Sequence, residues 1–226
     1  MAVAGRVGYP RGLTRATTKG SGVAKILVLF HSVSEHTWRL AEAVAEGAAG
    51  LEGCEAALKQ VPELADAEAI FGPGFDAGRK AFAHVETATI DDIAACDGLA
   101  IGTPVHYGNA SSTMRVFLDR TVKQYLEGGF IGKPATVFVS SAAGVGVEAA
   151  IQSVWSILAV HGMTIVPLGM RAPEIADLSG AHGGGAFGAA TLTRAPGERP
   201  SETERAIARV QGRALAEVSR AWALRP

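Results

Sequence analysis

Short apolar runs alternate along the chain with longer segments whose apolar residues recur every three or four positions. Residues 25–31 contain the run ILVLF, and comparable runs lie at 98–103 and 134–140. Short runs rich in Val, Ile, Leu and Phe are typical of strands that are buried on both faces of a parallel sheet. We expect two further strands at 55–61 and 164–169, the first of which has the weaker pattern.

The segments between these runs have helical spacing. Leu40, Val44 and Ala48 fall on one face of a helix expected from Thr37 to about Gly50. Further helices are expected at 89–95, at 111–125, around 151–161 and, opened by the capping box Ser201-x-x-Glu204, at 201–221. Five strands separated by helices predict an α/β protein with a doubly wound, five-stranded parallel sheet in a three-layer αβα arrangement.

Three segments fall outside this alternation. Residues 62–88 are polar and rich in Gly and Pro, and we expect an insertion with one or two short helices. Residues 170–200 are Gly-rich and are expected to fold back as a loop over the sheet edge. Residues 1–24 contain four basic residues and no acid, and we interpret them as a disordered N-terminal extension of a domain that spans 25–226. A transit peptide and a start codon placed too far upstream are the alternatives.

Composition restricts the class of protein. The chain has 226 residues, 48% of them hydrophobic and 19% charged, and a net charge of -1, which fits one soluble domain. This balance argues against nucleic acid as a partner, and no apolar run approaches the ~18 residues that a membrane span requires. Cys54 and Cys96 have no metal-ligand spacing. We expect no metal site, and two reduced thiols in a cytoplasmic protein.

The loop after the first strand carries hydroxyl groups where a helix begins. Ser32, Ser34 and Thr37 stand at i, i+2 and i+5. Backbone N–H groups and the positive dipole end at a helix N-terminus attract a phosphate without any cation. A simple helix cap is the alternative, although one hydroxyl would be enough for it. The pattern therefore favours a phosphate site.

The loops after the third and fourth strands should meet the first loop at the carboxyl edge of the sheet, where ligands of doubly wound folds bind. The sequence 103–109 combines a proline, an aromatic residue and a Gly-Asn pair, which is typical of a stiff loop able to hold a planar ring. The sequence 140–146 contains only small residues and valine, so a ligand can approach its backbone closely.

These motifs, in this order, resemble the WrbA-type NAD(P)H:quinone oxidoreductases, which are flavodoxin-like proteins that bind FMN. The similarity is closest at 102–121, 131–141 and 155–169, and it continues through 182–193 and 200–212. The resemblance implies a flavodoxin-like fold, FMN as cofactor, NAD(P)H as electron donor and a quinone as acceptor. It also implies a homotetramer with active sites at subunit contacts.

The resemblance also assigns roles to residues of the three loops. The FMN phosphate would be held by Ser32, Val33, Ser34, Glu35, His36 and Thr37. One side of the isoalloxazine would be bordered by Pro104, Val105, His106, Tyr107, Gly108 and Asn109. Its other edge would be bordered by Ser140, Ser141, Ala142, Ala143, Gly144 and Val145.

Two more positions match family residues outside these loops. His161 corresponds to a histidine near the flavin that is often contributed across a subunit contact, with a helix C-terminal cap as the alternative. Tyr125 stands where the family has a tryptophan that stacks on the ligand above the flavin, which makes it the expected substrate-binding residue. A purely core role on the apolar face of its helix is the alternative.

The chain departs from the family pattern at three positions. Glu35 stands where the family has a glycine, and Ala142 and Ala143 replace a glycine and a threonine. A carboxylate ~4 Å from a phosphate charge is repelled by about 1 kcal/mol in water and about 4 kcal/mol at an effective dielectric near 20. If Glu35 had a positive φ, backbone strain would be added. These departures are expected to weaken FMN binding unless Glu35 points into solvent.

The most favoured function is FMN-dependent transfer of two electrons from NAD(P)H to a quinone. The flavin would carry the chemistry, so no side chain is expected to act as a catalytic residue. One alternative is a one-electron carrier of the flavodoxin type, although such carriers are usually shorter and strongly acidic. The other is a flavin-free binding or scaffold protein, which the three departures would explain.

Overall fold

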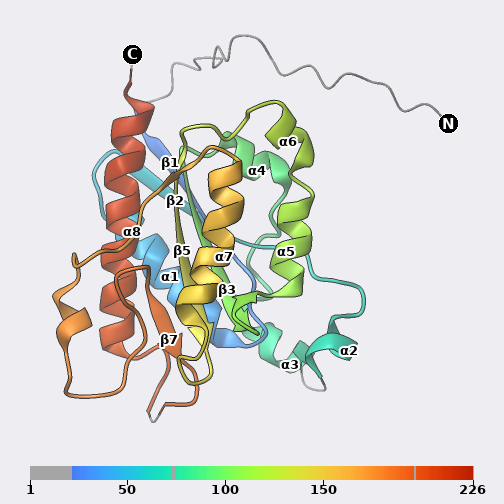
Figure 1. Cartoon of the computed structure of the whole chain (residues 1–226), viewed down its shortest axis with the longest axis vertical. Coiled ribbons are helices and arrows are strands. Elements are labelled where there is room, and N and C mark those ends of the chain that lie inside the picture. Colours follow the sequence, from blue (N-terminus) through green and yellow to red (C-terminus); the bar gives the residue numbers. More distant parts are fainter. Residues whose placement is uncertain (1–21, 73–74, 196, 226) are drawn as a thin grey trace.

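The computed structural model describes residues 22–72, 75–195 and 197–225. The predicted N-terminal extension lies outside these residues up to position 21, and the first strand already begins at Ala24. The strands are β1 (Ala24–Phe30), β2 (Cys54–Gln60), β3 (Gly98–His106), β4 (Asn109–Ala110), β5 (Pro134–Ser141), β6 (Thr164–Ile165) and β7 (Ala190–Leu192). Parallel strands in the order β2-β1-β3-β5-β6 form a central sheet (Figure 1).

Helices cover both faces of this sheet. The α-helices are α1 (Glu35–Ala49), α2 (Ala67–Phe71), α3 (Phe75–Arg79), α4 (Ile90–Ala95), α5 (Ser112–Asp119), α6 (Val122–Leu126), α7 (Val147–Val160) and α8 (Glu202–Ala223). Two 3₁₀ turns, η1 (Lys80–Phe82) and η2 (Pro173–Ala176), accompany them. The predicted three-layer α/β fold with a doubly wound sheet is confirmed. When the five strands of the central sheet are numbered along the chain, with β5 as the fourth and β6 as the fifth, their order is 2-1-3-4-5, which is the flavodoxin-like order.

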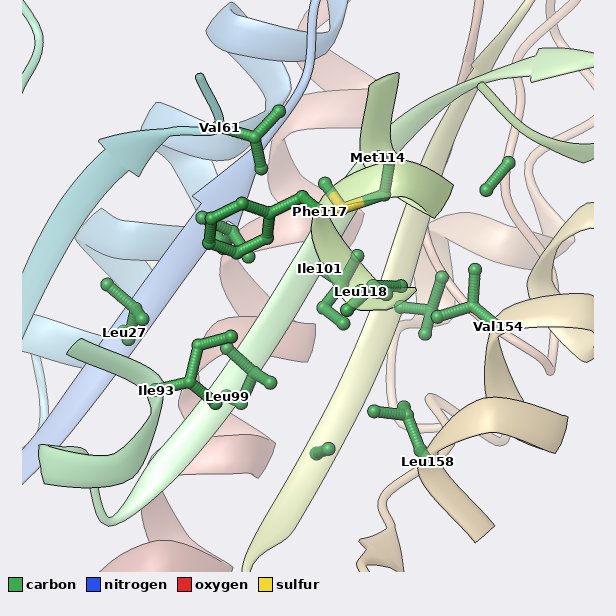
Figure 2. Close-up of a cluster of buried hydrophobic side chains, with 14 of the residues drawn as sticks. Leu27, Val61, Ile93, Leu99, Ile101, Met114, Phe117, Leu118, Val154 and Leu158 are labelled. Atoms are coloured by element: carbon green, nitrogen blue, oxygen red, sulfur yellow. The ribbon is translucent and has the colours of Figure 1, made fainter. Parts of the chain in front are cut away.

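Two cores lie on opposite faces of the sheet because successive strand residues point in opposite directions. Leu27 and Leu29 of β1 join the side chains of α4, α5 and α7 (Figure 2). Ile26 and Val28 join those of α1 and α8. Burial on both faces explains why the strands read as continuous apolar runs rather than as alternating patterns.

Glycines allow α1 and α8 to pack with their backbones in contact. A Cβ on Gly47 would lie 1.9 Å from the carbonyl oxygen of Arg209, and one on Gly212 would lie 1.9 Å from that of Val44. No side chain fits at such distances, so only glycine permits this packing. The shared face of the two helices closes the core that contains Phe30 and Phe138.

The fifth position of the sheet differs from the prediction. The strand expected at 164–169 is only two residues long. The N–H groups of Thr164 and Val166 donate to the carbonyl oxygens of Lys133 and Ala135, but the next carbonyl oxygen along β5, that of Val137, accepts from Gln211 Nε2 instead. The chain then leaves the sheet and returns as β7, which pairs in parallel with Val139–Ser141 of β5. The segment expected as a loop over the sheet edge at 170–200 therefore supplies a strand of that edge.

The helix expected at 111–125 is divided into α5 and α6. The break falls at Thr121, whose Oγ1 donates to the carbonyl oxygen of Leu118 at 2.6 Å. Tyr125 of α6 is 43% exposed, so a purely core role for it is wrong. The third strand is longer than predicted, since β3 runs on to His106 and takes in Pro104 and Val105.

Within 22–72, 75–195 and 197–225 no helix is both long enough and apolar enough to cross a membrane. The same residues contain no group of three or more His, Cys, Asp or Glu side chains arranged to hold a metal ion. Cys54 and Cys96 are both free thiols, and burial raises the pKa of Cys96 to about 11.

Candidate cofactor site at the carboxyl edge of the sheet

The three predicted loops converge because β1, β3 and β5 are neighbours that run in parallel. Thr37 Oγ1 and Ser140 Oγ are 2.7 Å apart, which joins the first loop to the third. A Cβ on Gly146 would lie 3.0 Å from Cα of Gly108, which places the second loop directly against the third. The site lies at the topological switch point between β1 and β3, where the helices that follow these strands, α1 and α5, cover opposite faces of the sheet. Ligands of this fold bind at this point.

The first loop forms a helix N-terminus rich in hydroxyl groups. Ser34 is the N-cap of the 15-residue helix α1, but its hydroxyl pairs with His36 Nδ1 at 2.7 Å instead of capping a backbone N–H. Ser32 Oγ accepts from the backbone N–H of Trp38 at 3.3 Å and donates to the carbonyl oxygen of Ser34. Since Ser34 does not cap the helix, the simple-cap alternative does not account for its hydroxyl. N–H groups at such a terminus suit an anion.

Glu35 is directed away from this loop. Its carboxylate accepts from Arg39 Nε at 2.8 Å, one helical turn further along α1. This hydrogen bond raises the pKa of Arg39, and Glu198 lies within 3.4 Å of the same guanidinium. Among the described non-glycine residues only Tyr107 has a positive φ, so Glu35 adds no backbone strain. The strained alternative considered for Glu35 is therefore wrong, and its charge is paired outside the loop.

The second loop is a tight hairpin turn between β3 and β4. His106 pairs with Asn109 across two central residues, Tyr107 at φ 52° and Gly108 at φ 72°, as in a type I′ turn. A left-handed backbone at a tyrosine costs about 1–2 kcal/mol. The Tyr107 ring is fully exposed at 104%. Backbone strain and an exposed aromatic side chain together make this turn a candidate for a ligand contact.

The third loop holds its backbone open through small residues. Ser140 and Ser141 end β5 in buried positions, and Ser141 Oγ accepts from the backbone N–H of Gly144 at 3.1 Å. Gly144 and Gly146 both have positive φ, and no side chain caps the helix α7 that follows. Ala142, Ala143 and Val145 are exposed, so the hydroxyl missing at Ala143 leaves no buried polar atom without a partner.

A cavity of about 430 Å³ opens beside the third loop. Its walls are the first turn of α7, which includes Glu148, and the glycine-rich stretch 182–188. Phe187 lines it and stacks on Trp155, with ring centroids 5.0 Å apart. The sequence resemblance covered this stretch but assigned no role to it, so Phe187 and His182 are site residues that sequence reasoning missed.

His161 and Tyr125 do not lie with the other predicted residues in a single chain. His161 ends α7, and the hydrogen bond from the N–H of Gly132 to the carbonyl oxygen of Gly162 places it at the amino end of β5. The eight residues of β5 therefore separate it from Ser141, over about 23 Å at 3.3 Å per residue. The two side chains contact each other instead, with ring centroids 5.7 Å apart.

His161 retains an unused polar atom. Its Nε2 lies 2.9 Å from Thr121 Oγ1, while its buried Nδ1 has no hydrogen-bond partner within the described chain. Burial lowers the pKa of His161, so the ring is neutral near pH 7. The cap alternative is correct for its backbone, since His161 is the C-cap of α7, but it leaves Nδ1 unexplained.

The strand order and the helices on both faces of the sheet define a flavodoxin-like protein. The chain belongs to the NADPH-dependent FMN reductase family, whose model matches residues 24–174. It is 42% identical to an NAD(P)H dehydrogenase (quinone) of Trichlorobacter lovleyi over 199 residues, 87% of this chain and 98% of that protein. The WrbA-type membership expected from the sequence is thereby confirmed.

Solved structures share the fold at lower identity. A WrbA-like flavodoxin of Agrobacterium tumefaciens has a TM-score of 0.60 at 22% identity and covers 88% of this chain and 98% of its own. A flavodoxin from the domain Archaea has a TM-score of 0.56 at 17% identity, with 86% and 98% covered. At these identities the likeness concerns the fold alone.

Proposed function

We propose that this chain binds FMN in the three loops at the carboxyl edge of the sheet and transfers two electrons from NAD(P)H to a quinone. The observation that carries the proposal is the first loop, where hydroxyls and a helix N-terminus converge while the one carboxylate is paired elsewhere. Family membership and the quinone-reducing relative support the same activity.

The residues present fit the cofactor. Backbone N–H groups at the start of α1, with the hydroxyls of Ser32, Ser34 and Thr37, would hold the phosphate. His36 adds a ring nitrogen at the same place, and burial lowers its pKa, so it is a neutral hydrogen-bonding group rather than a cation. Val33 and Glu35 would contribute only their backbone groups to the phosphate site.

The second and third loops would border the isoalloxazine. Residues 104–109 present the exposed Tyr107 ring, and residues 140–145 present backbone that no large side chain shields. The bound flavin supplies the acceptance and donation of electron pairs. The residues of the three loops would bind and orient the flavin, and the cavity lined by Phe187 opens beside the third loop. None of these side chains is required as a nucleophile.

The proposal includes a homotetramer in which His161 and Tyr125 serve a neighbouring subunit. The unpartnered Nδ1 of His161 and the half-exposed ring of Tyr125 support this. Exposed apolar side chains surround them on α6, the turn before β5 and the end of α7, namely Val122, Leu126, Ile131 and Val160. Two free thiols, with no disulfide between them, support a cytoplasmic location.

The first test is the visible absorption spectrum of the purified protein, as isolated and during titration with FMN. We expect flavin bands that saturate at about one FMN per chain, followed by NAD(P)H-dependent reduction of a simple quinone by the protein alone. A flavin-bound protein that does not oxidise NAD(P)H in the presence of a quinone would favour the one-electron carrier. A colourless protein that leaves the FMN spectrum unchanged would favour the scaffold.

A further inference from the structure

The first inserted segment, defined here as residues 62–88, lies against two of the three cofactor loops. The Phe71 ring of α2 stands between two histidines that end neighbouring strands. Its centroid is 5.4 Å from that of His31, directly after β1, and 5.5 Å from that of His106, at the end of β3. The segment therefore packs on the carboxyl edge of the sheet beside the proposed flavin site.

Helix α3 of this segment supports the backbone of the first loop directly. A Cβ on Gly78 would lie 2.8 Å from the carbonyl oxygen of Val33 and 3.3 Å from Cα of Ser34. Only glycine allows α3 to approach so closely. Any displacement of α3 therefore removes the support behind Val33 and Ser34, which precede the N–H groups proposed to hold the phosphate.

A partly buried polar network fixes α3 in this position. Arg79, the last residue of α3, donates to Glu63 Oε2 at 2.6 Å and to Gln60 Oε1 at 2.7 Å. Its guanidinium lies 5.3 Å from the ring centroids of both Phe75 and Phe82. Glu63 in turn accepts from Thr113 Oγ1 at 2.7 Å. The network thus joins α3 to the end of β2 and to helix α5.

His31 connects this network to the first loop. The ring is 1% exposed, with Nε2 3.1 Å from Glu63 Oε2 and Nδ1 2.8 Å from Ser111 Oγ. Ser111 Oγ already accepts from the N–H of Met114, so we assign its hydroxyl hydrogen to His31 Nδ1. His31 Nε2–H then donates to Glu63. His31 directly precedes Ser32, so the network ends where the proposed phosphate loop begins.

Burial and hydrogen bonds set the protonation states of Glu63 and His31. Burial alone would raise the pKa of Glu63, but hydrogen bonds from His31, Thr113 and the backbone N–H of Leu64 hold it at about 2. Burial lowers the pKa of His31 more than the nearby Glu63 carboxylate raises it. Near pH 7 a neutral histidine therefore donates to a carboxylate that is paired with Arg79.

We propose that Arg79, Glu63 and His31 are positioning residues that hold the first loop in the conformation that accepts a phosphate, and so make the site selective for a phosphorylated flavin. The inference rests on the proposed function. The network contacts the first loop through α3, which packs on Val33 and Ser34, and through His31, which directly precedes Ser32. The isoalloxazine, in contrast, would contact the second and third loops. Loss of the network should therefore weaken binding of the phosphate more than binding of the ring system, because hydrogen-bonded sites tolerate displacements of only about 0.5 Å.

The test compares FMN with riboflavin, which lacks the phosphate, by quenching of flavin fluorescence on titration of the apoprotein. The wild-type chain should bind FMN more tightly than riboflavin. Arg79→Met should lower the affinity for FMN about tenfold or more and the affinity for riboflavin less than about threefold, since a phosphate contact rather than the ring is lost. A merely structural role would lower both affinities together.

Arg209→Met is the matched control. Like Arg79, Arg209 donates to two side-chain oxygens, those of Glu46 at 2.9 Å and Glu202 at 2.7 Å, but on the exposed surface of α1 and α8. This variant should leave the ratio of FMN to riboflavin affinity unchanged. If Arg79→Met does not fold, Glu63→Gln replaces it, because the amide oxygen still accepts from Thr113 while the charge opposite Arg79 is lost.

The outcomes separate the two proposals. A wild-type chain that binds neither flavin overturns the proposed function and this inference with it. A wild-type chain that prefers FMN, with the same preference in the folded Arg79 or Glu63 variant, overturns the positioning role and leaves the function standing. A selective fall in FMN affinity in those variants, and not in Arg209→Met, supports it.

Discussion

Two inserted segments meet the sheet through different kinds of contact: residues 62–88, and residues 166–192, which leave the sheet after β6 and return to it as β7. The first is held by side chains: Arg79, Glu63 and His31 form its network, and Phe71 packs between two histidines. The second interrupts the fifth strand, so its backbone polar groups need partners of their own. Two side chains of α8, Glu204 and Gln211, supply those partners.

Glu204 and Gln211 form hydrogen bonds with backbone groups of the second segment, as a neighbouring strand would. Glu204 is completely buried and accepts from the N–H groups of Gly183 and Leu192, both at 2.9 Å. Gln211 Oε1 accepts from the N–H of Ala189 at 2.6 Å, while its Nε2 donates to the carbonyl oxygen of Val137 in β5. The second segment is therefore part of the fold itself, whereas the first serves the edge where the cofactor is proposed to bind.

Removal of the Glu204 carboxylate should give the largest effect. Glu204→Ala removes the acceptor of several donors, among them Thr191 Oγ1 at 2.8 Å, and it also removes the ion pair with Arg199 at 3.1 Å. We expect the free energy of unfolding to fall by about 3–5 kcal/mol, as for a buried ion pair that loses one partner. Urea unfolding followed by circular dichroism measures this.

Glu217→Ala, on the exposed face of the same helix, is the control and should change stability by less than about 0.5 kcal/mol. Equal losses in the two variants would show that the second segment is not held through α8.

Glycine substitutions should separate stability from cofactor binding. A Cβ on Gly188 would lie 2.2 Å from the carbonyl oxygen of Val137, so Gly188→Ala should destabilise the fold by about 1–3 kcal/mol through overpacking against β5. A Cβ on Gly78 would lie 2.8 Å from the Val33 carbonyl oxygen, against the first loop rather than against a strand of the sheet. We expect Gly78→Ala to lower FMN affinity with a smaller loss of stability.

Thermal unfolding and FMN titration of both variants test this difference. If Gly78→Ala is the more destabilising variant and retains normal FMN affinity, the expected difference between the two segments, cofactor binding for the first and stability for the second, is contradicted.

Acidification should act on the first segment through Glu63. Its pKa is about 2 in the folded chain and near 4.5 when unfolded, so it stabilises the fold above pH 4.5, and this stabilisation is lost as the pH falls towards 2. His31 acts in the same direction below its ordinary pKa of 6.5, because the fold favours its neutral form. The urea midpoint of the wild-type chain should fall between pH 5 and pH 3.

Glu63→Gln should be less stable at pH 7 and should lose less of its remaining stability over the same interval, because it has no carboxylate to protonate. The pKa of Glu204 is also lowered in the fold, where burial is outweighed by hydrogen bonds from backbone N–H groups. Some acid sensitivity should therefore persist in Glu63→Gln. A pH profile parallel to that of the wild-type chain would contradict the assignment to Glu63.

Much of this architecture follows from local patterns in the sequence. Buried runs such as 25–31 identify the strands, and Ser201-x-x-Glu204 correctly marks the start of α8. The division of the fifth strand had a local signal too, in Pro167, but a proline at the edge of a sheet is compatible with either outcome. The partner strand at 190–192 cannot be found in this way, since it is three residues long within a glycine-rich stretch.

The candidate site shows the same limit. The hydroxyls of the first loop are visible in the sequence, and Arg39 stands four residues after Glu35, at the spacing of a helical ion pair. By contrast, Glu63 follows His31 by 32 positions and precedes Arg79 by 16, with no periodicity that relates them. Only the packing of α3 on the sheet edge brings these three residues together.

The smallest effect is expected for an exposed ion-pair chain that links α1 to the residues after the second segment. Glu198 lies 3.4 Å from Arg39 and 3.2 Å from Arg205, and its side chain is 75% exposed. Exposed pairs contribute about 0.2–1 kcal/mol, so Glu198→Ala should lower stability by no more than about 0.5 kcal/mol and change the FMN dissociation constant less than about twofold.

This measurement is best made at two salt concentrations, because screening should remove even that small difference. A larger, salt-dependent fall in FMN affinity would mean that charge, and not only backbone pairing, ties the C-terminal part of the chain to the cofactor loop. The residues after the second segment would then act on phosphate binding as well as on stability.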